Sequence, residues 1–327
     1  MTIDKNVQPR RKLAVTRALP QQVLEHFRQR YDVRVNPLDR TLTPDELQRA
    51  AEGVDILVIT ASDRLDAAAV GRLPALLRIV ATYSVGIEHI DLDAARRRGI
   101  AVLSTPDVLS DSVAEMTVLL MLGAARRAHE GTSLLYDRRW TGWTPTQLVG
   151  IEVTGRRIGI LGMGRIGRTI ARRVRGFDMD VHYHNRRRLE PPLEDGATYH
   201  HTVESLLAAS DVLVLAAPST PETKGVLNDA RIGLMPPDSI VVNIARGDLV
   251  DDEALIAALR SGRIAAAGLD VFNHEPRLHS GYLELRNVFL QPHQGSSTLT
   301  ARLAMGRILL DGIDAVLADR PAPNRLT

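Results

Sequence analysis

The sequence predicts an α/β fold with two lobes, each built around a parallel sheet of the Rossmann or flavodoxin-like kind, and a cleft between the lobes. Short β-branched or apolar runs alternate with amphipathic stretches along nearly the whole chain, which is typical of βαβ units. A long apolar segment, residues 110–127, separates two blocks of this alternation. At 327 residues with 44% apolar content, the chain can form two domains, each with its own core.

The first block contains three clear strand patterns. KLAVT, DILVIT and RIVATYS predict strands at 12–16, 55–60 and 78–84, and a helical stretch follows each of them. The apolar segment 110–127 then predicts a buried connecting helix, for which Asp111 is the expected N-cap.

The second block shows the stronger alternation, with helices predicted between its strands. The expected strands are 157–161, 180–184, 211–215, 239–243 and 264–268. One more helix is predicted over 297–317, before the breaker-rich tail DRPAPNRLT. The first ten or so residues are expected to be disordered.

Composition limits the possible function classes. No run of about 18 apolar residues exists, and MTIDKNVQPRRK lacks the apolar core of a signal peptide, so we expect a soluble, cytoplasmic protein without a membrane partner. The absence of Cys excludes a disulfide framework and a thiolate nucleophile. The 41 Lys and Arg residues nearly balance the 39 Asp and Glu residues. Arginine clusters at 96–98 and 172–175 are therefore interpreted as solvated helix faces, and nucleic acid is not expected as a partner.

Three glycines after the first strand of the second block predict a dinucleotide site. The segment RRIGILGMGRIGRTIARRV places Gly162, Gly164 and Gly167 between an expected strand and an expected helix. The first glycine permits a tight turn, the second lets the backbone approach a pyrophosphate, and the third lets helix and strand pack closely. Further cofactor contacts are expected at the intervening residues Met163, Arg165 and Ile166.

The end of the next expected strand indicates which dinucleotide is bound. An NAD-selective site places Asp or Glu there to accept hydrogen bonds from the ribose 2′-hydroxyl, but this sequence has Asn185, Arg186 and Arg187. An amide can donate to a 2′-phosphate and a guanidinium can bind it in a fork. We therefore expect NADP(H) to be preferred over NAD(H), with a solvated basic loop as the alternative interpretation.

Histidines on the same expected strand could suggest a metal. His182 and His184 share a face of that strand, but no convincing third ligand accompanies them or the nearby pair His200 and His201. No metal site is predicted.

Seven segments, in one order along the chain, resemble a single family. They are TYSVGIEHIDL, TPDVLSDSVAE, WTGWTP, GILGMGRIG, VNIARGDLVDDEAL, AAAGLDVFNHEP and LQPHQGSST. Together they resemble the D-isomer-specific 2-hydroxyacid dehydrogenases, most closely the glyoxylate/hydroxypyruvate reductase branch. The resemblance covers nearly the whole chain. It implies NAD(P)-dependent reduction of a small 2-keto acid, glyoxylate or hydroxypyruvate, to the D-2-hydroxy acid.

The chemistry of such a reduction points to three residues. It requires a cation that holds the carboxylate and an acid that protonates the carbonyl oxygen as hydride arrives. Arg246 follows the strand IVVNIA and precedes a glycine, so it is expected at a strand end where its fork can bind the carboxylate. His293, after Pro292, is the expected general acid. Glu275, in FNHEP, is expected to pair with His293 and favour its imidazolium form.

The resemblance implies further contacts and an oligomer. The backbone N–H groups of Val85 and Gly86 would bind the substrate carboxylate, and Asp270 would contact the nicotinamide amide. Further implied cofactor contacts are Ala217, Pro218, Thr223, Ala245 and Gly295. In the resembling reductases the loop that contains Trp143 reaches the other subunit of a homodimer. Trp143 is therefore expected at the neighbour's substrate site, with packing within its own chain as the alternative.

The resemblance also implies how the chain divides. A substrate-binding domain would comprise 1–108 plus 296–327, and a dinucleotide-binding domain 109–295. Two alternative functions stay open: a 2-ketogluconate or other D-2-hydroxyacid dehydrogenase, and a dinucleotide-sensing transcriptional corepressor of the same fold. Turnover of glyoxylate with NADPH would distinguish the corepressor from the enzyme.

Overall fold

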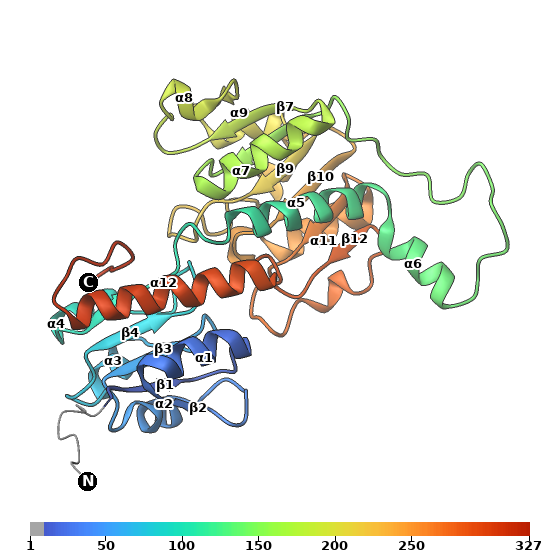
Figure 1. The fold of residues 1–327 in the computed structure, drawn as a ribbon. Coiled ribbons are helices and arrows are strands. Elements are labelled where there is room, and N and C mark those ends of the chain that lie inside the picture. The colour runs from blue at the N-terminus through green and yellow to red at the C-terminus, as the bar shows by residue number, and fades with distance from the viewer. Residues whose placement is uncertain (1–9) are drawn as a thin grey trace, which may run out of the picture. The chain divides into compact units, whose positions relative to one another are not determined.

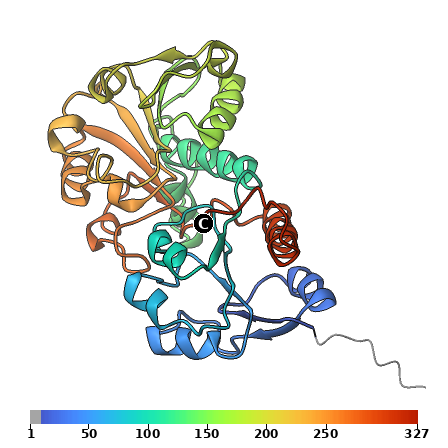
Figure 2. The ribbon, with the colours of Figure 1, turned by 90° about the vertical axis from the view of Figure 1, so that its left-hand side faces the viewer.

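The computed structural model describes residues 10–327, which form two compact units (Figures 1 and 2). One unit contains the described residues up to Leu109 together with Ser297–Thr327, and the other contains Ser110–Ser296. Residues 1–9, on which most of the expected N-terminal disorder falls, lie outside the described residues.

The first unit is built on a five-stranded parallel sheet in the order β2-β1-β3-β4-β5, which is the flavodoxin-like order. Its strands are β1 (Lys12–Val15), β2 (Asp32–Val35), β3 (Ile56–Ile59), β4 (Ile79–Thr82) and β5 (Ala101–Leu103). Its helices are α1 (Gln21–Arg30), α2 (Pro44–Ala51), α3 (Ala67–Arg72), α4 (Leu92–Arg97) and α12 (Leu299–Leu317). Every residue of β3 and β4 is buried, as expected for parallel strands covered on both faces. The C-terminal helix α12 packs against α1, β4 and β5, which joins the end of the chain to its beginning.

The second unit is built on a seven-stranded parallel sheet in the order β12-β11-β10-β9-β6-β7-β8. The strands are β6 (Arg157–Leu161), β7 (Asp180–His184), β8 (Thr198–Tyr199), β9 (Val212–Leu215), β10 (Ser239–Asn243), β11 (Ile264–Leu269) and β12 (Val288–Leu290). This is the doubly wound order, and its direction reverses between β6 and β9. Such a reversal opens a crevice at the carboxyl ends of the two strands, where ligands bind in open α/β sheets.

Helices cover both faces of this sheet. They are α5 (Ser110–Ala125), α6 (Ala128–Tyr136), α7 (Arg165–Val174), α8 (Pro191–Glu194), α9 (Val203–Ala208), α10 (Asp229–Ile232) and α11 (Asp252–Ser261), with 3-10 turns at Arg175–Phe177, Gly247–Leu249 and Ser280–Tyr282. Helix α5 packs against α7, β10 and β11, and Figure 1 shows it lying along this sheet. Its apolar sequence follows from this position, because most of its surface is covered.

The two parallel sheets confirm the predicted α/β fold class with two lobes. The expected strands of the second block agree with β6, β7, β9, β10 and β11 to within one residue. One detail was wrong: α5 already begins at Ser110, so Asp111 is not its N-cap. Asp111 lies in the first helical turn instead, where its carboxylate accepts a hydrogen bond of 2.7 Å from Arg173 and faces the positive end of the helix dipole.

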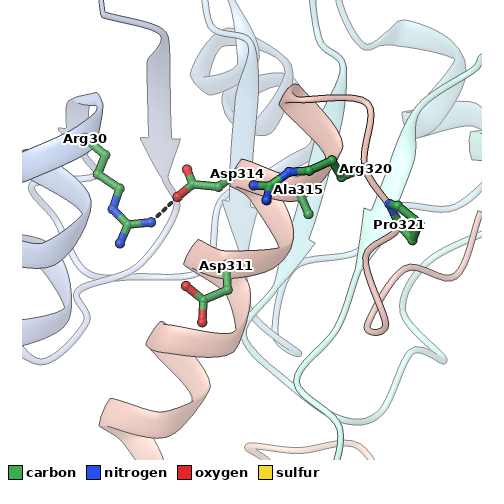
Figure 3. A pocket seen from close by; sticks show the side chains of 6 residues that line it. All are labelled: Arg30, Asp311, Asp314, Ala315, Arg320 and Pro321. Carbon is green, nitrogen blue, oxygen red and sulfur yellow. Dashed lines mark hydrogen bonds and ion pairs between the residues drawn. The ribbon is translucent and has the colours of Figure 1, made fainter.

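Two further features of the structure bear on what the protein could bind: the nature of its helices and a pocket in the first unit. No helix within residues 10–327 combines the length and the apolar character needed to cross a bilayer. A pocket of about 530 Å³ lies in the first unit (Figure 3), and it contains none of the predicted site residues. Its lining residues are Arg30, Asp311, Asp314, Ala315, Arg320 and Pro321.

Candidate active site

The predicted cofactor and catalytic residues of the second unit come from loops at one edge of its sheet. The glycine segment follows β6, Asn185 follows β7, and Ala217 and Pro218 follow β9. Ala245 and Arg246 come just after β10, Asp270 after β11, and His293 after β12. Because all seven strands are parallel, their carboxyl ends share this edge. Six separate chain segments are thereby brought to the same edge of the sheet.

The glycines of the loop after β6 differ in what they would contact if they carried a side chain. Gly162 has φ of 98°, and a Cβ there would lie 2.5 Å from the backbone nitrogen of Ala217, so the fold itself requires glycine. A Cβ on Gly167 would lie 2.6 Å from the carbonyl oxygen of Gly162. Gly164, in contrast, has a negative φ of −80°, and a Cβ there would meet no atom within 4 Å. Packing against the chain therefore does not require glycine at 164, and the absence of a side chain leaves room for a ligand to approach the backbone there.

The start of α7 completes this cradle. Gly164 is the N-cap of α7 and offers no side-chain cap, so the first N–H groups of the helix stay available at the sheet edge. These groups and the helix dipole favour an anion such as a pyrophosphate. The residues present thus fit a dinucleotide.

Asn185 holds the glycine loop from the neighbouring strand. Its Oδ1 accepts a hydrogen bond of 2.6 Å from the backbone N–H of Met163, and its Nδ2 lies 3.3 Å from the carbonyl oxygen of Met163. This contact was not foreseen from the sequence, which suggested only a phosphate contact. The side chain therefore positions the loop, whatever else it binds.

The rest of the loop after β7 is fixed by a network that leaves two arginines exposed. The buried Glu194 binds Arg188 through two hydrogen bonds, of 2.8 and 3.0 Å, and accepts another from the hydroxyl of Tyr183. Burial, followed by the bond to Glu194, raises the pKa of Tyr183 to about 12, so the phenol stays protonated and donates. Arg188 is thus held in its ion pair with Glu194, whereas Arg186 and Arg187 are exposed at the sheet edge.

Arg186 also has an electrostatic neighbour in the loop after β9. The hydroxyl of Thr220 and then, more weakly, the charge of Arg186 lower the pKa of Glu222, which lies in the loop after β9. Arg186 and Glu222 thus belong to the loops that follow β7 and β9, the two strands on either side of β6.

The candidate acid and its partner are in direct contact. Nδ1 of His293 lies 2.6 Å from Oε2 of Glu275, and the other carboxylate oxygen accepts a 2.9 Å bond from the N–H of Phe272. Burial, the largest influence, raises the pKa of Glu275. The hydrogen bond and charge of His293, the Phe272 amide and the charge of Arg246 outweigh it, so the net pKa of Glu275 is lowered. The carboxylate of Glu275 is thus ionised near neutrality. Nδ1 of His293 contacts this carboxylate, and Nε2 is the ring nitrogen that does not.

Asp270 links the loop after β11 to the loop after β12, which contains His293. Its carboxylate is 1% exposed and accepts hydrogen bonds of 2.6 and 2.7 Å from the N–H groups of Gln294 and Gly295, while its carbonyl oxygen accepts the N–H of His293. Burial raises the pKa of Asp270, although the two amides oppose that shift. Asp270 therefore fixes the loop that carries His293. The sequence suggested only a nicotinamide contact for it.

Arg246 stands in a turn that the buried Asn243 holds. Nδ2 of Asn243 donates a 2.8 Å bond to the carbonyl oxygen of Arg246, and Oδ1 accepts the N–H of Ala245. A Cβ on Gly247 would lie 1.9 Å from the carbonyl carbon of Phe272, so the turn passes directly beside the segment that leads to Glu275. Asn243 was missed from the sequence, although a polar residue that ends the apolar run IVV is a signal for such a role.

In the first unit, the predicted carboxylate-binding loop follows β4. Val85 is 39% exposed. Within residues 10–327, the N–H groups of Val85 and Gly86 donate no hydrogen bond to the chain itself. Two adjacent amides of this kind can bind an anion.

The loop that contains Trp143 belongs to an exposed arm of the second unit, formed by residues 126–150, which include α6. Helix α6 has no buried residue, and Figure 1 shows the arm running out from the rest of this unit. Trp143 is 79% exposed. Other large exposed side chains of the arm are Leu135, Tyr136, Trp140 and Val149. Packing within the chain therefore covers little of the arm.

The histidines near β7 form hydrogen bonds with each other and with neighbouring polar groups. Nδ1 of His182 lies 2.9 Å from Nε2 of His200, and Nε2 of His182 lies 3.1 Å from Asp180. Nδ1 of His184 lies 2.8 Å from the carbonyl oxygen of His200. In the part of the chain that the structure describes, no group of three or more potential ligands could hold a metal ion.

Comparisons with known proteins identify relatives along almost the entire chain. The family model for the NAD binding domain of D-isomer specific 2-hydroxyacid dehydrogenases matches residues 118–295. The glycerate dehydrogenase of Hyphomicrobium methylovorum is 43% identical over 309 residues, which cover 94% of this chain and 96% of the relative. The glyoxylate reductase of Thermococcus kodakarensis is 42% identical over 305 residues, 92% of this chain and 91% of the relative.

A solved structure shows the same fold. The NADPH-dependent glyoxylate/hydroxypyruvate reductase of Sinorhizobium meliloti, crystallised with NADP and malonate, is 31% identical and superposes with a TM-score of 0.86. The match covers 97% of each chain. The relatives thus share both units of the fold, not only the glycine loop.

Proposed function

The chain belongs to the D-isomer specific 2-hydroxyacid dehydrogenase family, and we propose that it reduces glyoxylate or hydroxypyruvate to the D-2-hydroxy acid with NADPH. The observation that carries this proposal is the 2.6 Å contact of His293 with Glu275, at the same sheet edge as the glycine loop. An acid and a dinucleotide cradle at one edge are what a keto-acid reduction needs. Relatives named glycerate dehydrogenase and glyoxylate reductase support the small substrate.

In this proposal His293 protonates the substrate. A bound nicotinamide dinucleotide supplies the hydride, and Nε2 of His293 gives its proton to the carbonyl oxygen as negative charge develops there. Nδ1–H stays on the ring because it donates to the ionised Glu275, which stabilises the imidazolium before transfer and orients the neutral ring afterwards. In this proposal Glu275 orients the imidazole ring of His293, and His293 transfers the proton.

The substrate carboxylate would be bound by a cation and two amides. Arg246, at the end of β10, would pair with one side of the carboxylate, while the N–H groups of Val85 and Gly86 would donate to it. The first unit would then be the substrate-binding domain and the second the dinucleotide-binding domain. Asp270, besides holding its loop, would be near the nicotinamide.

NADPH is proposed over NADH because of the loop after β7. Arg186 and Arg187 are exposed in this loop, whereas Arg188 is held by Glu194. The reductase of Sinorhizobium meliloti, which is NADPH-dependent, supports this assignment by its overall similarity.

Initial-rate kinetics test the function. We expect glyoxylate and hydroxypyruvate to be the best of a panel of 2-keto acids, and kcat/KM to be higher with NADPH than with NADH. Replacing Arg186 and Arg187 together with Ala should lower kcat/KM with NADPH by about tenfold or more, as hydrogen bonds to charged groups contribute about 1.5 to 3 kcal/mol each. The NADH value should hardly change, and Arg286→Ala, an exposed arginine of the same unit, is the matched control. A wild-type preference for NADH would refute the NADPH assignment, and absence of keto-acid turnover would refute the enzyme.

We also propose a homodimer formed through the arm that contains α6. The exposed Leu135, Tyr136, Trp140, Trp143 and Val149 supply apolar surface that a second copy would cover. Sedimentation analysis should show a dimer that replacement of Trp140 and Trp143 by Ser weakens. Trp143 would reach the substrate site of the other subunit, so that Trp143→Ala alone would raise the keto-acid KM. A monomeric wild type would contradict both statements.

A further inference from the structure

A chain of hydrogen bonds links His89 to the carboxylate-binding loop of the first unit. Nε2 of His89 lies 2.9 Å from the hydroxyl of Thr82, and that hydroxyl lies 2.7 Å from the hydroxyl of Ser84. The hydroxyl of Ser84 in turn lies 2.7 Å from the carbonyl oxygen of Gly86. Thr82 is fully buried at the end of β4, so the middle of this chain is shielded from water.

Counting hydrogens fixes the direction of every bond. A carbonyl oxygen can only accept, so Ser84 gives its single hydroxyl hydrogen to Gly86. Ser84 must then accept from Thr82, whose own single hydrogen is used in that bond. Thr82 must therefore accept from His89, so Nε2 of His89 carries a hydrogen. The chain runs from His89 to Gly86 and polarises each bond in the same direction.

The chain ends beside the amides that are proposed to bind the carboxylate. The carbonyl oxygen of Gly86 is held by Ser84, and the carbonyl oxygen of Ser84 accepts a 3.0 Å bond from the N–H of Thr105. In a trans peptide the N–H points away from the carbonyl oxygen, so the N–H of Val85 is turned from Thr105. The peptide between Val85 and Gly86 is thus bracketed by two anchored peptides.

We propose that His89 is a positioning residue for substrate binding, which acts through Thr82 and Ser84 to keep the amides of Val85 and Gly86 in place for the carboxylate. This inference rests on the proposed function, because it assumes that these two amides bind the keto acid. His89 itself touches neither substrate nor cofactor in this role. It lowers the cost of ordering the loop when the ligand arrives.

The test is a set of variants along this chain of hydrogen bonds, for which the keto-acid KM, kcat and the cofactor Kd are measured. His89→Ala and Ser84→Ala should each raise the keto-acid KM by about 5- to 10-fold, the value of one net hydrogen bond, with a much smaller effect on kcat. The Kd for NADPH should be unchanged, which a general loss of structure would not allow. His89→Asn retains an N–H donor and should restore most of the lost affinity. His26→Ala, an exposed histidine of α1, is the matched control.

The double variant separates positioning from two independent local effects. If His89 and Ser84 act through the same chain of hydrogen bonds, the double variant should have nearly the KM of either single variant. If they act independently, the two increases in KM should multiply. An unchanged KM in the single variants, or multiplying effects, would overturn the proposal. Thr82→Val, which replaces the hydroxyl with a methyl group of similar size, gives the same test if His89→Ala fails to fold.

A ligand that cannot be reduced distinguishes this proposal from the proposed function. The Kd of oxalate reports carboxylate binding without turnover. If the wild type reduces no 2-keto acid but binds oxalate, and the variants weaken that binding, the proposed function fails and the positioning role stands. If the variants reduce keto acids and bind oxalate as the wild type does, only the positioning role fails.

Discussion

The side chain of Asn185 is hydrogen-bonded to the backbone of Met163, with 2.6 Å between Oδ1 and the Met163 nitrogen. The residue that the sequence suggests for cofactor selection is therefore part of the frame that holds the glycine loop. We therefore expect cofactor affinity to depend on Asn185, and cofactor selectivity to depend on Arg186 and Arg187 in the same loop.

Asn185→Ala should weaken NADPH and NADH alike. The lost bonds to Met163 loosen the glycine loop, which both cofactors would use, and about 1.4 kcal/mol of lost order corresponds to about tenfold in Kd. Fluorescence titration with each cofactor measures this. Weakening of NADPH alone would show instead that Asn185 acts mainly on the 2′-phosphate.

Gly164→Ala should leave folding intact and impair cofactor binding. Its Cβ meets no atom of the chain within 4 Å, and φ at this position is −80°, so the thermal midpoint should fall only by the small amount that separates Gly from Ala at a helix N-cap. A methyl group against the pyrophosphate should raise the Kd of both cofactors by about tenfold or more, since overpacking costs about 1–3 kcal/mol. Gly162→Ala should behave differently and lower the midpoint itself, because its Cβ would lie 2.5 Å from Ala217. Equal thermal midpoints for the two variants would argue against this distinction.

His293→Ala should lower kcat by about 10²- to 10⁴-fold, the usual contribution of a general acid. NADPH affinity should stay nearly the same, because the ring is held by Glu275 and not by the glycine loop. His279→Ala provides a matched control, since His279 forms a similar contact of 2.9 Å with Glu253 outside the strand-end loops. Comparable losses of kcat in the two variants would disprove the assignment of His293.

Glu275→Gln should make stability less dependent on acid. The pKa of Glu275 is lowered in the folded protein, so the ionised carboxylate stabilises the fold above the ordinary pKa of glutamate, and that contribution is lost as pH falls through the folded-state pKa. At neutral pH the variant should be less stable by about 1 kcal/mol, a modest value because the pair is partly exposed. Urea midpoints across the acid range should converge for the two proteins. A constant difference at every pH would contradict the linkage.

The sequence was informative wherever a feature depends on local pattern. Apolar runs gave the long strands almost to the residue, since burial on both faces leaves a continuous signal. Strands β8 and β12 were not predicted, because two or three residues show no periodicity. The turn at Gly162 followed from a motif whose glycines have a geometric cause.

Side-chain direction, in contrast, depends on packing that no local pattern records. Nothing in the segment around Asn185 shows that its amide turns toward Met163. The two amides that Asp270 binds lie 24 and 25 residues further along the chain, so only the folded sheet brings them together. The link from His89 to Gly86 lies within one short segment, yet it depends on a buried hydroxyl whose orientation the sequence does not show.

The order of the second sheet puts the loop after β7 far from the loop after β12. The strands between them are β6, β9, β10 and β11, and at about 4.8 Å per strand the two loops are about 24 Å apart along the edge. We therefore expect that Arg186 and Arg187 can be exchanged without moving the imidazole of His293, the proposed general acid. The residues proposed to select the dinucleotide are thus separate in the sheet from the residue proposed to deliver the proton, and we expect that dinucleotide preference can be engineered without altering proton delivery.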